Sequence, residues 1–149
     1  MNRIAVFGLA AVAAAFLPGA TPPKAGEIAV TVTDLRSAKG AVRACLTSRA
    51  DGFPRCRQDA AALETVVPAA NGRVQFIFTN VKPGRYAVAV LHDENGNGKA
   101  DRALGMMPKE GFGFSRDAKV TTGPPKFDAA AFDYGGEAST LSIRMRYML

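Results

Sequence analysis

The sequence predicts an all-β protein, specifically an antiparallel β-sandwich with long loops at one end. From residue 26 onward, most of the chain alternates between apolar and polar residues with a period of two, which is the pattern of half-buried strands. Glycine, proline and asparagine separate these segments, as turn residues do. The N-terminus has the features of an exported protein. Short strands and frequent turns in an exported chain together favour a sandwich.

The first twenty residues, MNRIAVFGLAAVAAAFLPGA, have the layout of a secretory signal peptide. A single charged residue, Arg3, precedes an apolar stretch from residue 4 to residue 17, and small residues follow. The alternative is a retained membrane anchor, but this stretch is shorter than the ~20 residues needed to span a bilayer. We therefore expect cleavage after Ala20 and a periplasmic or secreted protein.

The remaining chain, residues 26–149, is long enough for one domain with its own core and too short for two. No second apolar run is present, so we expect no membrane span in the mature protein. Loss of Arg3 leaves eighteen basic and thirteen acidic residues. The basic residues are scattered and not interleaved with aromatic residues, which argues against nucleic-acid binding. Weak attraction to an acidic envelope polymer is consistent with the positive charge.

Five segments alternate clearly enough to be predicted as strands. They are residues 27–35, 40–47, 73–81, 85–93 and 139–149. In the third segment, Val74, Phe76 and Phe78 share the face that we expect to be buried. The intervening segments 57–68 and 126–136 lack this period, and we expect short helical turns or irregular connections there.

Cys45 and Cys56 are the only two cysteines. Alternation in the segment GAVRACLT places Cys45 on the polar face, where a following loop that contains Cys56 can fold back onto it. An oxidising compartment favours bonding such a pair. The C-x-x-C spacing of redox motifs is absent, so we predict a structural disulfide; two free thiols are the alternative.

The segment LHDENGNGKAD, residues 91–101, has the spacing of a calcium-binding loop. Gly98 occupies position 6 of such a loop, where the chain turns sharply. The oxygen ligands at positions 1, 3, 5, 7 and 9 would come from Asp93, Asn95, Asn97, the Lys99 carbonyl and Asp101. This spacing predicts that the side-chain oxygens of the loop converge on one point.

Position 12 of the loop is Leu104, where a bidentate glutamate is usual. A cation would therefore be held weakly, with a dissociation constant of roughly 10⁻⁴ to 10⁻³ M. Glu110 is the nearest downstream carboxylate, and we expect it to supply the missing ligand by packing against this loop. The alternative is a metal-free turn, because tandem Asn-Gly pairs favour tight turns and the aspartates can bond the loop amides.

The following segment LGMMPKEGFGFSRDA, residues 104–118, contains three glycines, a proline and two phenylalanines. This composition predicts a long loop without a regular strand or helix. Phe112 and Phe114 are expected to plug the end of the sandwich.

Two motifs in this region are long enough to be specific. The first, H-D-x-N-x-N-G-x-x-D, runs from His92 to Asp101, and the second is Gly105 followed by P-x-E-G-x-G-F-S, which ends at Ser115. With them the chain resembles a family of small exported bacterial proteins classed as a domain of unknown function. The asparagines usual after Gly-Phe-Ser are here Arg116 and Asp117. The resemblance implies an exported sandwich similar to transthyretin-like or carboxypeptidase-regulatory domains, and it implies no particular activity.

We therefore expect a non-catalytic, exported binding or accessory module, with calcium as the candidate ligand. A hydrolase would use His92 with Glu110 or Asp93 as acid and base, and Ser115 as nucleophile. Such a triad needs an oriented base and an oxyanion hole, and the spacing of these residues provides neither. A purely structural envelope protein is the third hypothesis, and it differs from the first by having no ligand.

Overall fold

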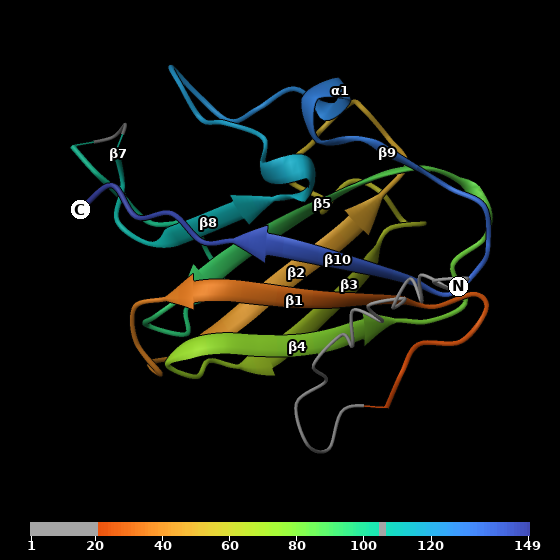
Figure 1. Cartoon of the computed structure of the whole chain (residues 1–149). Coiled ribbons are helices and arrows are strands. Elements are labelled where there is room, and N and C mark those ends of the chain that lie inside the picture. The colour runs from red at the N-terminus through yellow and green to blue at the C-terminus, as the bar shows by residue number, and fades with distance from the viewer. Residues whose placement is uncertain (1–20, 105–106) are drawn as a thin grey trace, which may run out of the picture.

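Two β-sheets pack face to face in the computed structural model, which describes residues 21–104 and 107–149 (Figure 1). The predicted signal peptide and Gly105 lie outside the described residues. The strands are β1 (Ile28–Leu35), β2 (Ala41–Thr47), β3 (Leu63–Pro68), β4 (Gly72–Phe78), β5 (Gly84–Asp93), β6 (Arg102–Ala103), β7 (Met107–Pro108), β8 (Gly111–Phe114), β9 (Phe132–Tyr134) and β10 (Ser139–Arg144). Short helical segments are η1 (Ser115–Asp117) and α1 (Phe127–Ala130). The predicted all-β sandwich is confirmed.

The first sheet has the strand order β10-β1-β4. Strand β1 pairs antiparallel with β4, with Val30 opposite Phe76, and parallel with β10, with Val30 opposite Leu141. The sandwich is therefore antiparallel except for this one described pair. Because β1 and β10 come from opposite ends of the domain, no tight hairpin constrains their relative direction.

The second sheet has the order β3-β2-β5-β8, and β9 also pairs with β5. Neighbouring strands in this sheet are antiparallel, with Val42 opposite His92 and His92 opposite Gly111. This register places the end of β5, the start of β2 and the start of β8 side by side. The 93–110 region therefore emerges at one end of the second sheet.

The main core lies between the two sheets and is built from the predicted inward faces. Its fully buried members include Ile28, Val30, Val32, Val42, Val88 and Ile143, each 0% exposed. A second apolar cluster lies on the other face of β5, where Ala87 points away from Val88 because side chains alternate along a strand. There Phe53 packs edge-on against Phe114 and Phe127, so the loops around residues 53 and 127 cover the sheet.

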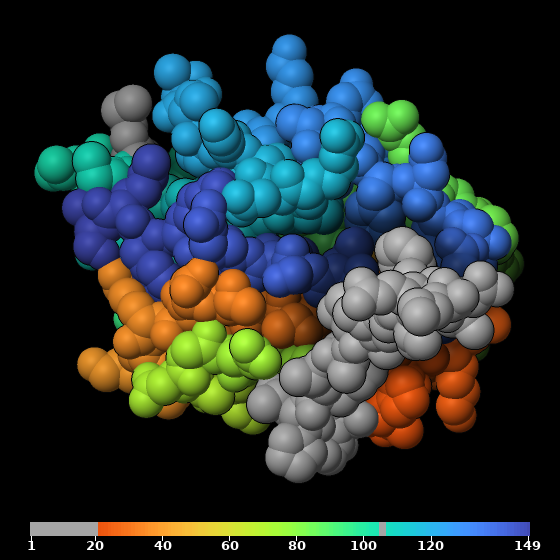
Figure 2. Space-filling view, in the orientation of Figure 1, coloured from red at the N-terminus to blue at the C-terminus, as the bar shows by residue number. Residues whose placement is uncertain are grey.

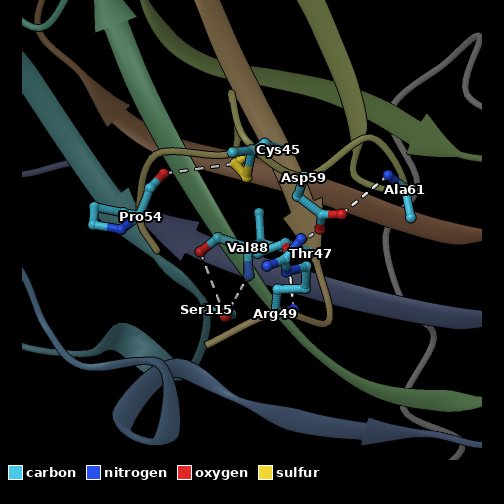
Figure 3. The surroundings of a disulfide bond; sticks show 9 residues. Cys45, Thr47, Arg49, Pro54, Asp59, Ala61, Val88 and Ser115 are labelled. Atoms are coloured by element: carbon cyan, nitrogen blue, oxygen red, sulfur yellow. Dashed lines mark hydrogen bonds between the residues drawn. A yellow bond between two sulfur atoms is a disulfide. The ribbon is translucent and has the colours of Figure 1, made fainter. Parts of the chain in front are cut away.

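Cys45 and Cys56 form the predicted disulfide, with 6.3 Å between their Cα atoms. Cys45 points away from the main core, and the returning loop buries it (Figure 3). Asp59 fixes the same loop, since its carboxylate accepts hydrogen bonds from the Thr47 hydroxyl (2.5 Å) and from the Ala61 amide (3.0 Å). The segment after Cys56 is thus a set of turns, and a helix does not form there.

Several strands lie where none was expected, and β3 and β8 are the longest of them. Strand β3 occupies the second half of segment 57–68, at the edge of its sheet, where the half-buried alternation of Leu63, Thr65 and Val67 is weak. Strand β8 contradicts the prediction that residues 104–118 hold no regular strand. Its glycines permit close packing, because a Cβ on Gly113 would lie 2.7 Å from Ile143 Cγ2. The expected helical turn in segment 126–136 is present as α1.

The chain after β10 links the edges of the two sheets, which are β10 in the first sheet and β8 in the second. Arg146 forms an isolated antiparallel bridge with Phe112 of β8, while β10 itself pairs with β1. Figure 2 shows β10 and the segment that follows it as a blue band between orange β1 and the cyan residues that follow β8. Within the described residues, no helix combines the length and apolar character required to cross a membrane.

Candidate functional site

The polar loop between β5 and β6 is anchored by Asp93, whose side chain is 0% exposed. Its Oδ1 accepts a hydrogen bond from the Asn97 amide (3.1 Å), and its Oδ2 accepts one from the Gly98 amide (2.8 Å). Gly98 has φ +75°, a left-handed conformation that glycine adopts without strain. Asp93 thus closes the turn that the Asn-Gly pairs begin.

Arg43 of β2 pairs with the same carboxylate, with its Nε 2.8 Å from Asp93 Oδ2. Burial by itself would raise the pKa of Asp93, but the hydrogen bonds from Arg43 and from the two loop amides outweigh it. The pKa of Asp93 is therefore lowered from its ordinary value. Both oxygens of Asp93 are committed to the loop and to Arg43, and Asp93 does not line the open depression described below.

Asn95, Asn97 and Asp101 meet at one point on the outer side of the loop. The Nδ2 atoms of Asn95 and Asn97 lie 2.7 and 2.8 Å from Asp101 Oδ2. The Oδ1 atoms of the two asparagines accept the amides of Asn97 (3.1 Å) and Lys99 (2.9 Å). Three of the four side chains that the spacing was expected to bring together thus meet, while Asp93 faces the loop amides and Arg43 instead. The two asparagines present N–H groups at the meeting point, where the prediction placed oxygens.

Glu110 is the contact between this loop and the segment before β8. Its Oε2 accepts a hydrogen bond from the Asp101 amide (3.2 Å), and the Lys109 amide donates to the Asp101 carbonyl (2.9 Å). Glu110 is 5% exposed, and its Oε1 is buried without a hydrogen-bond partner among the described residues. Burial raises the pKa of Glu110, and the charges of Asp101 and Asp93 add to the rise; favourable interactions with the Asp101 and Glu94 amides oppose it without cancelling it.

An open depression of about 450 Å³ lies over these residues. Its lining consists of Glu94, Asn95, Asn97, Asp101, Arg102, Lys109 and Glu110. Within the described part of the chain, no group of three or more His, Cys, Asp or Glu side chains is already arranged to hold a metal ion.

Arg36, from the β1–β2 connection, stabilises the rim of the depression. Its Nε lies 2.6 Å from Glu94 Oε1, and its Nη2 donates to the Lys109 carbonyl (3.2 Å). The guanidinium also lies over the Tyr147 ring, 4.4 Å from its centroid. Its hydrogen bond to Glu94 lowers the pKa of that carboxyl. Arg36 and Arg43 are therefore site residues that the sequence analysis did not identify.

His92 is 0% exposed and serves the packing of this end of the sandwich. Its Nε2 lies 2.9 Å from the Lys39 carbonyl, and its Nδ1 lies 2.7 Å from the Tyr147 hydroxyl. A carbonyl only accepts, so Nε2 donates to Lys39, and in the neutral imidazole Nδ1 then accepts from the Tyr147 hydroxyl. Both ring nitrogens are thereby occupied.

Ser115 lies in a different environment from His92. Its Oγ accepts a hydrogen bond from the Val88 amide (2.9 Å) and donates to the Ala130 carbonyl (2.5 Å). The side chain is buried and ties η1 to β5 and α1. His92 and Ser115 thus have separate partners: the Lys39 carbonyl and the Tyr147 hydroxyl for His92, and backbone groups for Ser115.

Arg116 and Asp117, at which the chain departs from the motif, have an unusual backbone conformation. Both residues have left-handed backbones, with φ of 56° and 51°. Asparagine adopts this region more readily than most residues, so the asparagines that the resemblance implies at these positions would suit the turn itself. Asp117 accepts hydrogen bonds from Arg144 and Arg146 in this chain, away from the 93–110 loop.

Comparison with models of protein families gives a match. The model of the family described as "Uncharacterized protein conserved in bacteria (DUF2141)" matches residues 30–142. No curated protein and no solved structure matches the chain. The matched region includes most of β1, strands β2 to β5, the polar loop, Glu110 and most of β10. The chain therefore belongs to this family of uncharacterized conserved bacterial proteins, as the resemblance implied.

Proposed function

We propose that this chain is an exported, non-catalytic binding or accessory module, and that the depression over residues 94–110 weakly binds a hard divalent cation of the calcium class. The observation that carries the proposal is the buried, unpartnered Oε1 of Glu110 beside Asp101. An unpaired buried carboxylate is costly unless a proton or a cation neutralises it. A bound cation would satisfy this atom and reduce the repulsion between Glu110 and Asp101.

The two asparagines next to Asp101 can complete such a site. A half-turn of an amide exchanges its N–H₂ group for its oxygen at nearly the same place. Turning Asn95 and Asn97 would direct two oxygens toward Asp101, where their Nδ2 atoms now lie. Rotating these side chains breaks their Oδ1 hydrogen bonds with two exposed loop amides. The cost in free energy is modest because water can hydrogen-bond to those amides instead.

Affinity at this site should be low. Asp101 and Glu110 supply two formal charges, and Arg102 and Lys109 line the same depression. Sites with few charged ligands bind calcium with dissociation constants of roughly 10⁻⁴ to 10⁻³ M. Such an affinity suits a compartment in which calcium is abundant. The disulfide between Cys45 and Cys56 supports an oxidising, extracytoplasmic location.

Catalysis receives less support from the contacts of the candidate residues. A general base must reach the proton that it removes. Both ring nitrogens of His92 are already in hydrogen bonds, with the Lys39 carbonyl and the Tyr147 hydroxyl. Ser115 lacks a hydrogen bond to His92 in the described contacts and bonds to the backbone instead. A binding role does not require His92 or Ser115 to give up these hydrogen bonds.

The test is the melting temperature of the exported protein with calcium varied up to roughly 10 mM, because a ligand that binds only the native state raises it by mass action. The parent should gain stability, whereas E110Q should gain little. E64Q, which changes an exposed carboxylate on β3, should behave as the parent does. A parent whose melting temperature calcium leaves unmoved would favour the purely structural role.

A further inference from the structure

We propose that the Asn95–Gly96 pair is a site of spontaneous modification, at which the Asn95 side chain loses ammonia and a carboxylate replaces its amide. Glycine after asparagine favours this reaction, because without a Cβ its amide nitrogen can approach the preceding side chain closely. The chain contains three such pairs, which are Asn71–Gly72, Asn95–Gly96 and Asn97–Gly98. The structure distinguishes among them, and the inference does not depend on the proposed cation site.

The reaction needs these two residues and water. The Gly96 nitrogen attacks Cγ of Asn95 and forms a cyclic imide, while its proton passes to solvent. The bond between Cγ and Nδ2 breaks, and the side-chain nitrogen takes up a proton and leaves as ammonia. Water then opens the imide, at Cγ to give an aspartate or at the backbone carbonyl to give an isoaspartyl linkage. No oxidant or reductant is involved.

The loop keeps the reacting atoms of Asn95 and Gly96 close together. Asn95 Oδ1 accepts a hydrogen bond from the Asn97 amide (3.1 Å), and the ring that this bond closes contains both Cγ of Asn95 and the Gly96 nitrogen. The same hydrogen bond draws electrons from Cγ, which favours attack on it. Asn95 and Gly96 are exposed, so water reaches them. Asn97 closes an equivalent ring with the Lys99 amide (2.9 Å), so the ring alone does not separate the two pairs.

The attacking nitrogen separates them. The Gly98 amide donates a hydrogen bond of 2.8 Å to Oδ2 of Asp93, which is 0% exposed. Attack by this nitrogen would break a hydrogen bond to a buried charge, which is stronger than one between neutral groups. Among the described hydrogen bonds, the Gly96 amide makes a long one of 3.4 Å to the Asp93 carbonyl. Gly96 is therefore the better nucleophile, and Asp93 protects Asn97.

The Asn71–Gly72 pair is exposed but is held differently. In the described hydrogen bonds, the Asn71 side chain closes no ring of this kind, and the Asn71 carbonyl accepts the Arg73 amide (3.0 Å). Gly72 is the first residue of β4 and is paired with Leu35 of β1. The strand fixes the backbone without holding the reacting atoms together. We therefore expect Asn71 to react more slowly than Asn95.

Modification at Asn95 would change the charge of the depression. Asn95 Nδ2 donates a hydrogen bond to Asp101 Oδ2 (2.7 Å), and both residues line the depression. A carboxylate at position 95 would replace this donor with an acceptor and place two negative charges side by side. Like charges at this distance repel each other. The polar loop would lose a stabilising contact, and the depression would become more acidic as the protein ages.

The test follows the loss of ammonia at each pair. The exported protein is kept at mildly alkaline pH, folded or in urea, and its peptides are analysed by mass spectrometry over time. In the folded protein, Asn95 should react about tenfold faster than Asn97, because Gly98 must first leave Asp93. Asn71 should also react more slowly than Asn95. In urea the three pairs should react at similar rates, because the fold no longer distinguishes them.

Reaction of Asn97 or Asn71 in the folded protein at the rate of Asn95, or faster, would overturn the inference. A folded protein in which Asn95 stays intact while it reacts in urea would overturn it as well. N95Q supplies a matched control, because its longer side chain would have to form a larger ring. Peptides that contain position 95 should then lose no ammonia there, while Asn71 keeps its parental rate; continued loss at position 95 would contradict the mechanism.

N95D represents the aspartate product and tests the consequence for the loop. Repulsion from Asp101 should lower its melting temperature below that of the parent at neutral pH. The two melting temperatures should converge at acidic pH, where both carboxylates are protonated. An N95D protein that melts with the parent at every pH would overturn the proposed change in the depression.

Discussion

Glu110 and Asp101 are joined across two loops by a hydrogen bond of 3.2 Å from the Asp101 amide to Glu110 Oε2. This contact places a nearly buried carboxylate next to a second acidic side chain, with Glu110 Oε1 left unpartnered. An arrangement of this kind stores unfavourable electrostatic energy at neutral pH. The first prediction concerns how that energy depends on protonation.

Without calcium, E110Q should be more stable than the parent at neutral pH. The pKa of Glu110 is raised in the folded state, so its stabilising contribution is present below its ordinary pKa of 4.5 and is lost as pH rises through the folded pKa. Glutamine resembles the protonated carboxylic acid, so E110Q does not lose stability as the pH rises. We expect a gain of about 1 kcal/mol, or roughly 4 °C in melting temperature.

The measurement is thermal unfolding of E110Q and the parent in EDTA as a function of pH. The two curves should converge at acidic pH, where the parent is also protonated. A variant less stable than the parent throughout the pH range would show that the Glu110 carboxylate is well satisfied in solution.

D93N should destabilise the protein at neutral pH by about 2 kcal/mol, because hydrogen bonds to a buried charge are lost and an amide N–H₂ then faces other donors. The pKa of Asp93 is lowered, so its stabilisation is present above its ordinary pKa of 3.8 and is lost as pH falls through the folded pKa. Urea unfolding at neutral and acidic pH measures the difference. Asp133 is exposed, and the control D133N should change the free energy of unfolding little. If D93N lost the same stability at every pH, the electrostatic origin of the effect would be contradicted.

The sequence alone predicts the sandwich because its five strongest strands alternate, and their inward residues, such as Val30 and Phe76, are buried together. It also predicts the contact between Glu110 and the polar loop. Strand β8 escaped prediction because glycine is unfavourable in strands unless another segment packs closely against it, which here is the chain around Ile143. That neighbour is distant in sequence.

The orientation of Asp93 could not be predicted for a similar reason. Spacing within the loop brings Asn95, Asn97 and Asp101 together, since these contacts are local. Whether Asp93 faces a cation or a protein group depends on Arg43, fifty residues earlier in the chain. Only the register of β2 against β5 brings the two side chains together.

G113A should destabilise the fold by about 2 kcal/mol, as overpacking of a well-filled site does. The added Cβ would lie 2.7 Å from Ile143 Cγ2 and 2.9 Å from the Arg144 carbonyl, and the backbone cannot rotate away as a side chain can. Chemical denaturation measures the loss. G123A, at a site with nothing within 4 Å, should be neutral, and equal effects in both variants would contradict the packing argument.

Removal of the disulfide should destabilise the protein without altering its calcium response. The bond between Cys45 and Cys56 closes a loop with a sequence separation of 11 residues, and such a cross-link contributes about 3 kcal/mol by restricting the unfolded chain. The C45S/C56S variant should therefore unfold at lower urea concentration than the oxidised parent. Reduction of the parent should produce a similar loss, while reduction of the variant should change nothing.

The loop also carries Phe53, which packs on Phe114 in the second apolar cluster, whereas the 93–110 site depends on β5 and β8. Calcium should accordingly raise the melting temperature of the variant and of the parent by the same amount. A calcium response lost together with the disulfide would show that the Cys56 loop, through the contact of Arg57 with Gly98, shapes the site directly.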